Sequence, residues 1–132
     1  MTTTTTTYEN DNLIVHVSRH GHDARVAWTG ESDGRSPGDF LNPLMTRLVK
    51  EFTGLQVTID FSGLTYMNSA TVAPLIMCIK AFDGAAESVL VIFSDMDWQR
   101  THVQCVRTIS RTLKKVKIEV RPTAKPGSTS LT

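Results

Sequence analysis

Hydroxyl and amide side chains gather in one short stretch, residues 65–71 (TYMNSAT), between a β-branched run and an apolar segment of helical spacing. Ser69 and Thr71 are hydroxyls that a kinase could phosphorylate, and Asn68 is a residue type common at helix starts. The free amides and the dipole at a helix start favour an added phosphate. We therefore expect function to reside in this stretch.

Motifs for enzymatic chemistry are absent from the sequence. Ser69 lacks the flanking glycines of a nucleophile elbow. Gly30, Gly34 and Gly38 precede a helix, but no Lys-Ser/Thr pair follows them as in a phosphate-binding loop. We therefore expect a protein that is not an enzyme and that needs no cofactor.

Three histidines lie in or near the first predicted hairpin, at His16, His20 and His22. No cysteine or carboxylate spacing completes a metal site with them, so we expect solvated turn residues and no metal. Glu31 and Asp33 could form an acid/base pair, but a Gly-rich loop favours a turn role for them.

Asp60 falls near the end of a predicted strand, at the edge where α/β sheets place ligands. It could be a phosphoacceptor of the response-regulator receiver type, or it could cap the following turn. No acidic pair follows the first strand to hold Mg²⁺, which counts against the receiver alternative. A small-ligand or nucleotide site at the same loop has only this edge position in its favour.

The composition is that of one ordinary domain: 132 residues, 40% hydrophobic, 20% charged and a net charge of +1. Without a basic excess, we expect neither nucleic acid nor an anionic membrane as a partner. No apolar run could span a bilayer and no signal peptide is evident, which predicts a cytoplasmic protein. We expect flexible tails at 1–7 and 121–132 around a domain at 8–120.

The predicted elements follow the order ββαβαβαβ. Residues 13–17 and 25–29 form a hairpin turning at Gly21. The next helix could begin after Ser36 or after Asn42, and Pro43 favours the later start because proline is unfavourable inside a helix. A strand at 55–61, a helix at 72–82, a buried strand at 89–93, a third helix and a strand at 116–120 complete an α/β fold. We expect a mostly parallel sheet with an antiparallel start and three main helices.

The helix at 72–82 carries two apolar faces. Val72, Leu75, Ile76, Ile79 and Phe82 are its predicted core stripe. The other face is small and apolar, so it is either covered by this chain or a patch where a partner docks. That second face consists of Ala70, Ala73, Pro74, Met77 and Ala81.

Two stretches resemble the STAS domain of bacterial anti-sigma factor antagonists and sulfate-transporter tails. Residues 28–33 (WTGESD) are similar to its "l-x-G-e-l-D" pattern, and residues 57–71 (VTIDFSGLTYMNSAT) to its "vvlDlsgltfmDSSG" signature. The similarity in element order covers about residues 13–120. The resemblance implies a protein-binding module for partner switching, docking on an anti-sigma factor that is also a serine kinase of the histidine-kinase-like ATPase type. It also places Asp60, Glu31 and Asp33 near the site.

In such antagonists the kinase phosphorylates a serine at the start of the second helix, which ends binding, and a phosphatase restores it. Here Ala70 occupies that acceptor position, Asn68 stands for the usual Asp and Thr71 for the Gly. Ser69 or Thr71 could accept phosphate instead, or the protein could bind its partner without phosphorylation. Pro74 fits a helix starting at about Thr71, with 68–70 in the preceding loop.

The resemblance and the apolar face together define the expected docking site. It comprises Asn68, Ser69, Ala70, Ala73, Pro74 and Met77, and the same helix face could also pair two copies of the chain.

Overall fold

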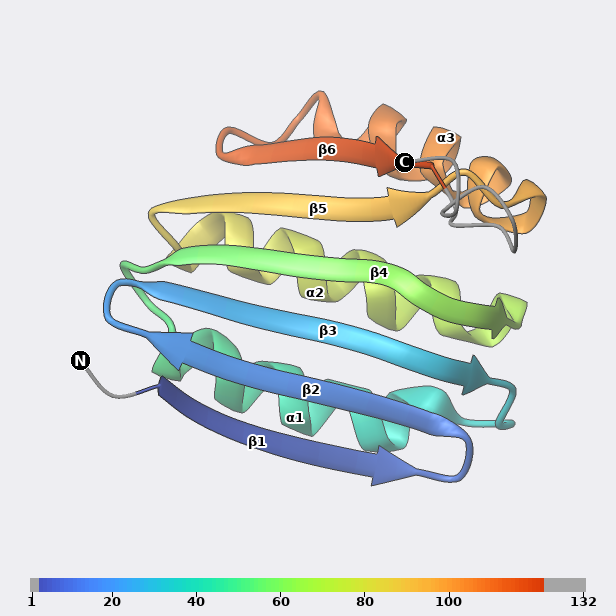
Figure 1. Ribbon diagram of the computed structural model, residues 1–132. Coiled ribbons are helices and arrows are strands. Elements are labelled where there is room, and N and C mark those ends of the chain that lie inside the picture. The colour runs from blue at the N-terminus through green and yellow to red at the C-terminus, as the bar shows by residue number, and fades with distance from the viewer. Residues whose placement is uncertain (1–2, 123–132) are drawn as a thin grey trace, which may run out of the picture.

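A computed structural model describes residues 3–122 as two layers, a six-stranded sheet and helices packed on one of its faces (Figure 1). The elements in chain order are β1 (Thr3–Asn10), β2 (Leu13–His20), β3 (Asp23–Ser32), α1 (Pro37–Glu51), β4 (Gln56–Met67), a 3₁₀ turn (Ser69–Thr71), α2 (Val72–Ala85), β5 (Ser88–Ser94), α3 (Asp97–Ser110) and β6 (Val116–Arg121).

The strands lie in the sheet in their sequence order, β1-β2-β3-β4-β5-β6. β1, β2 and β3 pair antiparallel, and the pairs from β3 to β6 are parallel. Gly21, at a φ of 62°, makes the β2–β3 turn as predicted. The predicted α/β class with three helices, an antiparallel start and a mostly parallel remainder is confirmed.

The prediction of a flexible tail at residues 1–7 is wrong for the residues that the structure describes. Thr3–Asn10 pairs along its whole length with β2, so the element order has one more initial strand than predicted. Threonine is β-branched and favours strands, but the run lacks the apolar alternation that marks a half-buried strand. Only Tyr8 packs against the core, with Arg47 over its ring at 5.0 Å.

At the other end of the chain, the predicted tail at 121–132 begins with Arg121, which still belongs to β6. The rest of that prediction concerns residues that, from 123 onward, lie outside the described part of the chain.

The later start predicted for the first helix is also wrong, because α1 begins at Pro37 and continues through Pro43. Pro43 is exposed, so its ring points to solvent and the helix loses a single amide donor. Leu41, fully buried, extends the apolar stripe one turn before Leu44 and Leu48. Its burial offsets the cost of the interior proline.

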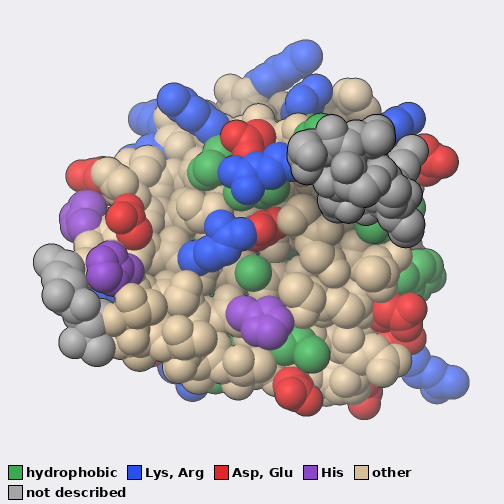
Figure 2. All heavy atoms as spheres, viewed as in Figure 1, with side chains coloured by type: hydrophobic (Ala, Val, Ile, Leu, Met, Phe, Trp, Pro, Cys, Tyr) green, Lys and Arg blue, Asp and Glu red, His purple; other side chains and the backbone are tan. Residues whose placement is uncertain are grey.

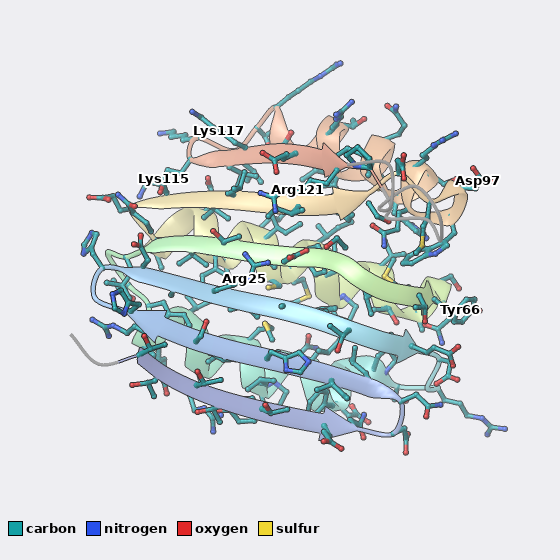
Figure 3. The ribbon with its side chains drawn as sticks, viewed as in Figure 1. Arg25, Tyr66, Asp97, Lys115, Lys117 and Arg121 are labelled. Atoms are coloured by element: carbon teal, nitrogen blue, oxygen red, sulfur yellow. The ribbon has the colours of Figure 1, made fainter. Side chains whose placement is uncertain are left out.

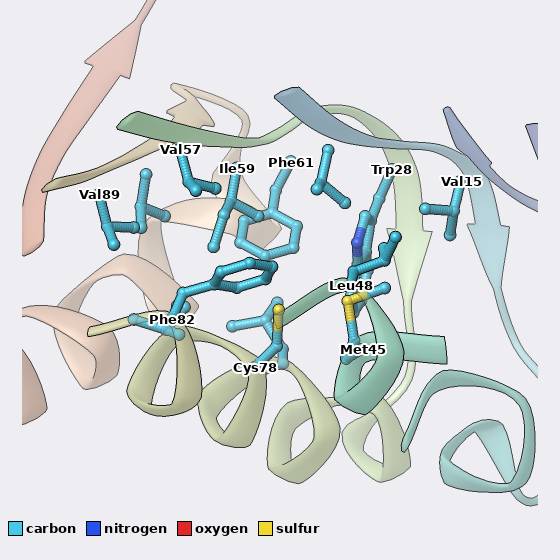
Figure 4. Packing of buried hydrophobic residues seen from close by; sticks show 14 of the residues in the cluster. Val15, Trp28, Met45, Leu48, Val57, Ile59, Phe61, Cys78, Phe82 and Val89 are labelled. Carbon is cyan, nitrogen blue, oxygen red and sulfur yellow. The ribbon is translucent and has the colours of Figure 1, made fainter. Parts of the chain in front are cut away.

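The core lies between the sheet and the helices (Figure 4). Trp28 meets Phe61 edge to face at 4.8 Å, and Phe61 stacks on Phe93 at 5.3 Å, which joins β3, β4 and β5. β4 extends six residues beyond its predicted end at Phe61, to Met67, with register shifts against β3. This extension carries the chain directly to the loop before α2.

Candidate functional site

The loop between β4 and α2 is tied to the end of β3 by polar contacts. The amide of Asn68 donates to the Ser32 carbonyl at 2.9 Å, and its Nδ2 donates to the Gly34 carbonyl at 2.8 Å. Thr71 Oγ1 donates to Asn68 Oδ1 at 2.8 Å and lies 2.6 Å from Ser32 Oγ. Both backbone and side chains therefore fix the shape of this loop.

The two candidate phosphoacceptors lie in different environments. Thr71 is completely buried and its hydroxyl has two partners, Asn68 and Ser32. Ser69 is exposed, and so is Ala70 beside it. A kinase could reach the Ser69 hydroxyl in this conformation, whereas Thr71 would first have to leave its contacts.

α2 begins at Val72, in agreement with the predicted start at about Thr71, and residues 69–71 form the 3₁₀ turn before it. Thr71 occupies the cap position, but its hydroxyl serves the loop and caps no helix amide. Pro74 falls in the first turn, where no helix amide partner is needed. The sequence correctly indicated where the helix starts, but not the function of the Thr71 side chain.

One side of α2 is exposed and apolar. We call Ala70, Ala73, Met77 and Ala81 the α2 ridge; all four are exposed, and Met77 keeps 57% of its surface. Within residues 3–122, the chain leaves this face uncovered. Tyr66, 48% exposed, lies one residue before the end of the strand extension that leads to the ridge (Figure 3).

Pro74 was predicted on this exposed face, and that placement is wrong. It is buried and lies beside α1, where a Cβ placed on Gly38 would be 3.6 Å from Pro74 Cγ. The buried stripe is correspondingly rotated from the predicted one. Leu75, Ile79 and Phe82 are buried as expected, Val72 and Ile76 are only partly buried, and Cys78 joins the core.

The sequence led us to expect Asp60 near the end of its strand, and that expectation is wrong. β4 continues to Met67, so Asp60 is in mid-strand. Its Oδ2 pairs with Arg25, and its Oδ1 accepts hydrogen bonds from the Ser62 amide at 2.8 Å and hydroxyl at 2.6 Å. Both carboxylate oxygens therefore have partners. Ser62 lies within β4 like Asp60 itself, so Asp60 does not cap a turn at the end of the strand, which was the alternative expectation.

Glu31 and Asp33 flank buried Ser32 and are themselves exposed, next to the loop. The histidines contact separate partners: His16 Nε2 lies 3.0 Å from Thr29 Oγ1, His20 Nδ1 lies 2.8 Å from Thr3 Oγ1, and His22 faces Glu87. Across the described residues, no three His, Cys, Asp or Glu side chains converge as metal ligands would.

Gln99 was not recognised from the sequence. This fully buried side chain of α3 donates through Nε2 to the carbonyls of Phe61, at 3.2 Å, and Leu64, at 3.1 Å. Its Oε1 accepts from the Ser94 amide at 2.7 Å. The pairing of β4 with β5 ends at Asp60. Beyond that point Gln99 bonds to the β4 carbonyls that have no partner on β5. The sequence did contain a signal for this role: Gln99 is spaced so that it shares the buried stripe of α3 with Val103 and Val106.

The fold and the site together define a two-layer α/β domain with a hydrogen-bonded loop and an exposed apolar face on α2. The described residues include no helix with the length and apolar character needed to cross a membrane. No family model matches the chain, and no curated protein matches it. Among solved structures it is similar to SiaC of Pseudomonas aeruginosa, with a TM-score of 0.56 and 11% identity, covering 89% of this chain and 99% of SiaC. At that identity, the similarity concerns the fold.

Proposed function

We propose that the chain is a cytoplasmic, non-enzymatic regulatory module that binds another protein, in the manner of an anti-sigma factor antagonist. The proposed partner is an anti-sigma factor or serine kinase of the histidine-kinase-like ATPase type, in a bacterial partner-switching pathway that controls transcription. The observation that carries the proposal is the α2 ridge, an uncovered apolar helix face beside a loop held in one shape.

The chemistry of the ridge supports protein docking. Three alanines allow another backbone to approach closely, and Met77 supplies a flexible side chain that adapts to an apolar surface. The remaining exposed charge on this side of α2 is Lys80. Since the loop is already ordered, binding would cost little additional conformational entropy.

Ser69 is the proposed regulatory hydroxyl. It is exposed and lies next to Ala70, where an added phosphate would place about two negative charges against an apolar interface. Desolvating that charge opposes binding, so phosphorylation would release the partner. If Ser69 is not modified, the protein would remain a constitutive binder.

The test is calorimetry of the full chain with purified histidine-kinase-like ATPase proteins encoded by the same genome. A partner should bind the wild type, and Met77→Glu should weaken binding at least about tenfold because it buries a charge. Gln104→Glu introduces the same charge on an exposed site of α3 and should leave affinity unchanged. The proposal fails if no such protein binds or if both variants bind like the wild type.

Ser69 is tested in the same assay after incubation with the candidate kinase and ATP. A single phosphate should be localised to Ser69 by mass spectrometry and should abolish binding, and Ser69→Ala should remain unmodified and bind. Modification of Thr71 would instead show that the loop opens. If neither residue is modified, the protein binds its partner constitutively and Ser69 has no regulatory role.

A further inference from the structure

The sheet face opposite the helices, which we call the open face, is not covered by any described helix (Figure 1). Parallel sheets are usually covered on both faces. Here side chains of the open face alternate with core residues along β2, along β3 and at the starts of β4 and β5. Strand register aligns five of them in one row across the sheet: Ser18, Arg25, Thr58, Leu90 and Lys117.

This row crosses a cavity of about 570 Å³, near the edge where β4, β5 and β6 begin. The volume lies within the range of roughly 300–1,000 Å³ that is typical of small-molecule sites. Figure 3 labels three cations of its lining: Arg25 on β3, Lys117 on β6, and Lys115 just before β6. The cavity is at the opposite end of the parallel strands from the loop of 68–71, so it is separate from the proposed docking site.

The lining combines apolar surface with three cations, Arg25, Lys115 and Lys117. Asp60 holds one nitrogen of Arg25 and leaves the other guanidinium N–H groups free to bind. Lys115 is a second cation of the lining, and its Nζ donates to the Ala86 carbonyl at 2.8 Å. Lys117 is the third cation, and Asp23 is the one carboxylate among the described lining residues.

The remaining polar lining indicates the kind of ligand. Ser18, Thr58, Ser88 and Gln56 present hydroxyl and amide groups, which pair well with ligand hydroxyls. Phe, Tyr and Trp are absent from the described lining residues, and the one aromatic ring there is the imidazole of His20, whose Nδ1 lies 2.8 Å from Thr3 Oγ1. Figure 2 shows Lys and Arg side chains on this face, interspersed with Asp, Glu and His.

We propose that this cavity binds a small organic phosphate with a hydroxylated body, of the sugar-phosphate class. The phosphate contacts Lys117 and Lys115, and the hydroxyls contact the row between Arg25 and Leu90. This site is independent of partner docking on the α2 ridge.

The experiment is an NMR titration of the ¹⁵N-labelled full chain with ribose 5-phosphate, with ribose and inorganic phosphate as separate controls. Saturable shifts of the amides of Arg25, Thr58 and Lys117 are expected, with each control at least about tenfold weaker because it lacks half of the contacts. Absence of saturable shifts at millimolar ligand overturns the proposal. Equal binding of inorganic phosphate overturns the sugar-phosphate assignment.

Lys117→Gln should weaken binding of ribose 5-phosphate about tenfold, which is the loss of one charge-assisted hydrogen bond. Lys114→Gln removes the same charge from an exposed position before β6, outside the cavity, and should change affinity less than twofold. Equal weakening in both variants would indicate non-specific attraction, and an unchanged Lys117→Gln would place the ligand elsewhere; either result contradicts the site.

Discussion

At the scale of single residues, Thr71 and Gln99 use polar groups to hold the loop and the strand that leads to it. Neither side chain is accessible: both are completely buried. Each joins segments more than thirty residues apart in sequence, Thr71 reaching Ser32 and Gln99 reaching Phe61. The docking loop therefore depends on buried hydrogen bonds as well as on its own sequence.

Gln99→Leu should lower the free energy of unfolding by about 2–4 kcal/mol, because two carbonyls and one amide lose their buried partner. Urea denaturation measures the loss. Gln104→Leu, on the exposed side of the same helix, should stay within about 0.5 kcal/mol of wild type. Similar values for the two variants would contradict the bracing role of Gln99.

Thr71→Val should cost about 1–3 kcal/mol, since Asn68 and Ser32 both lose a buried partner. Thr71→Ser keeps the hydroxyl and should recover most of the stability. Thermal unfolding of both variants, beside Ser69→Ala as an exposed control, checks this. A Thr71→Val variant as stable as Ser69→Ala would show that the buried contacts contribute nothing.

The two thiols should differ in reactivity. Burial raises the pKa of Cys78 to about 12, so at pH 8 this group is a neutral thiol, whereas Cys105 is exposed. Iodoacetamide at pH 8 should add one label in the folded state, at Cys105, and two in urea. Intact mass spectrometry counts the labels; double labelling of folded protein would contradict the burial of Cys78.

At the scale of elements, backbone geometry sets the position of β3 relative to β2. Gly30 has a φ of 85°, and a Cβ there would lie 2.1 Å from the Asn12 carbonyl oxygen. The same region contains the register shifts that let β4 run on to Met67. Gly30 therefore lies both against the turn after β1 and beside a register shift in the β3–β4 pairing.

Gly30→Ala should destabilise the protein by at least about 2 kcal/mol, because both the positive φ and the contact with Asn12 disfavour a side chain. Gly84→Ala, in α2 with no atom within 4 Å of the new Cβ, should stabilise it by up to about 1 kcal/mol. Opposite signs in chemical denaturation are the expected result, and destabilisation by both would contradict it.

Much of this architecture could be predicted from sequence, because β2, β3, β5 and the helices bury regular apolar patterns. β1 could not, since its threonines contribute backbone pairing and almost no core. The start of α1 could not be predicted because it depends on two opposing effects, the favourable burial of Leu41 and the cost of Pro43 inside the helix. The sequence does not show how deeply Leu41 is buried. The position of Asp60 depended on the length of β4, and that length is determined by register and by Gln99 rather than by local pattern.

At the scale of the whole molecule, β1 shields the edge of β2. Deleting residues 2–7 should leave the fold intact, because the core starts at Leu13. It should also speed hydrogen exchange of β2 amides that lose partners, with a stability loss of about 1–2 kcal/mol. Exchange mass spectrometry measures this. Peptides of β6 serve as the internal control. Unchanged exchange in β2 would instead support a flexible tail at residues 1–7.

The sequential order of the strands also bears on how the chain can fold as it is synthesised. Each strand after the first pairs with the strand made just before it, so none has to insert between two strands that are already joined. Contacts of short sequence separation generally favour fast folding. The sheet can thus grow from its N-terminal edge as the chain is made, with β6 pairing with β5 last.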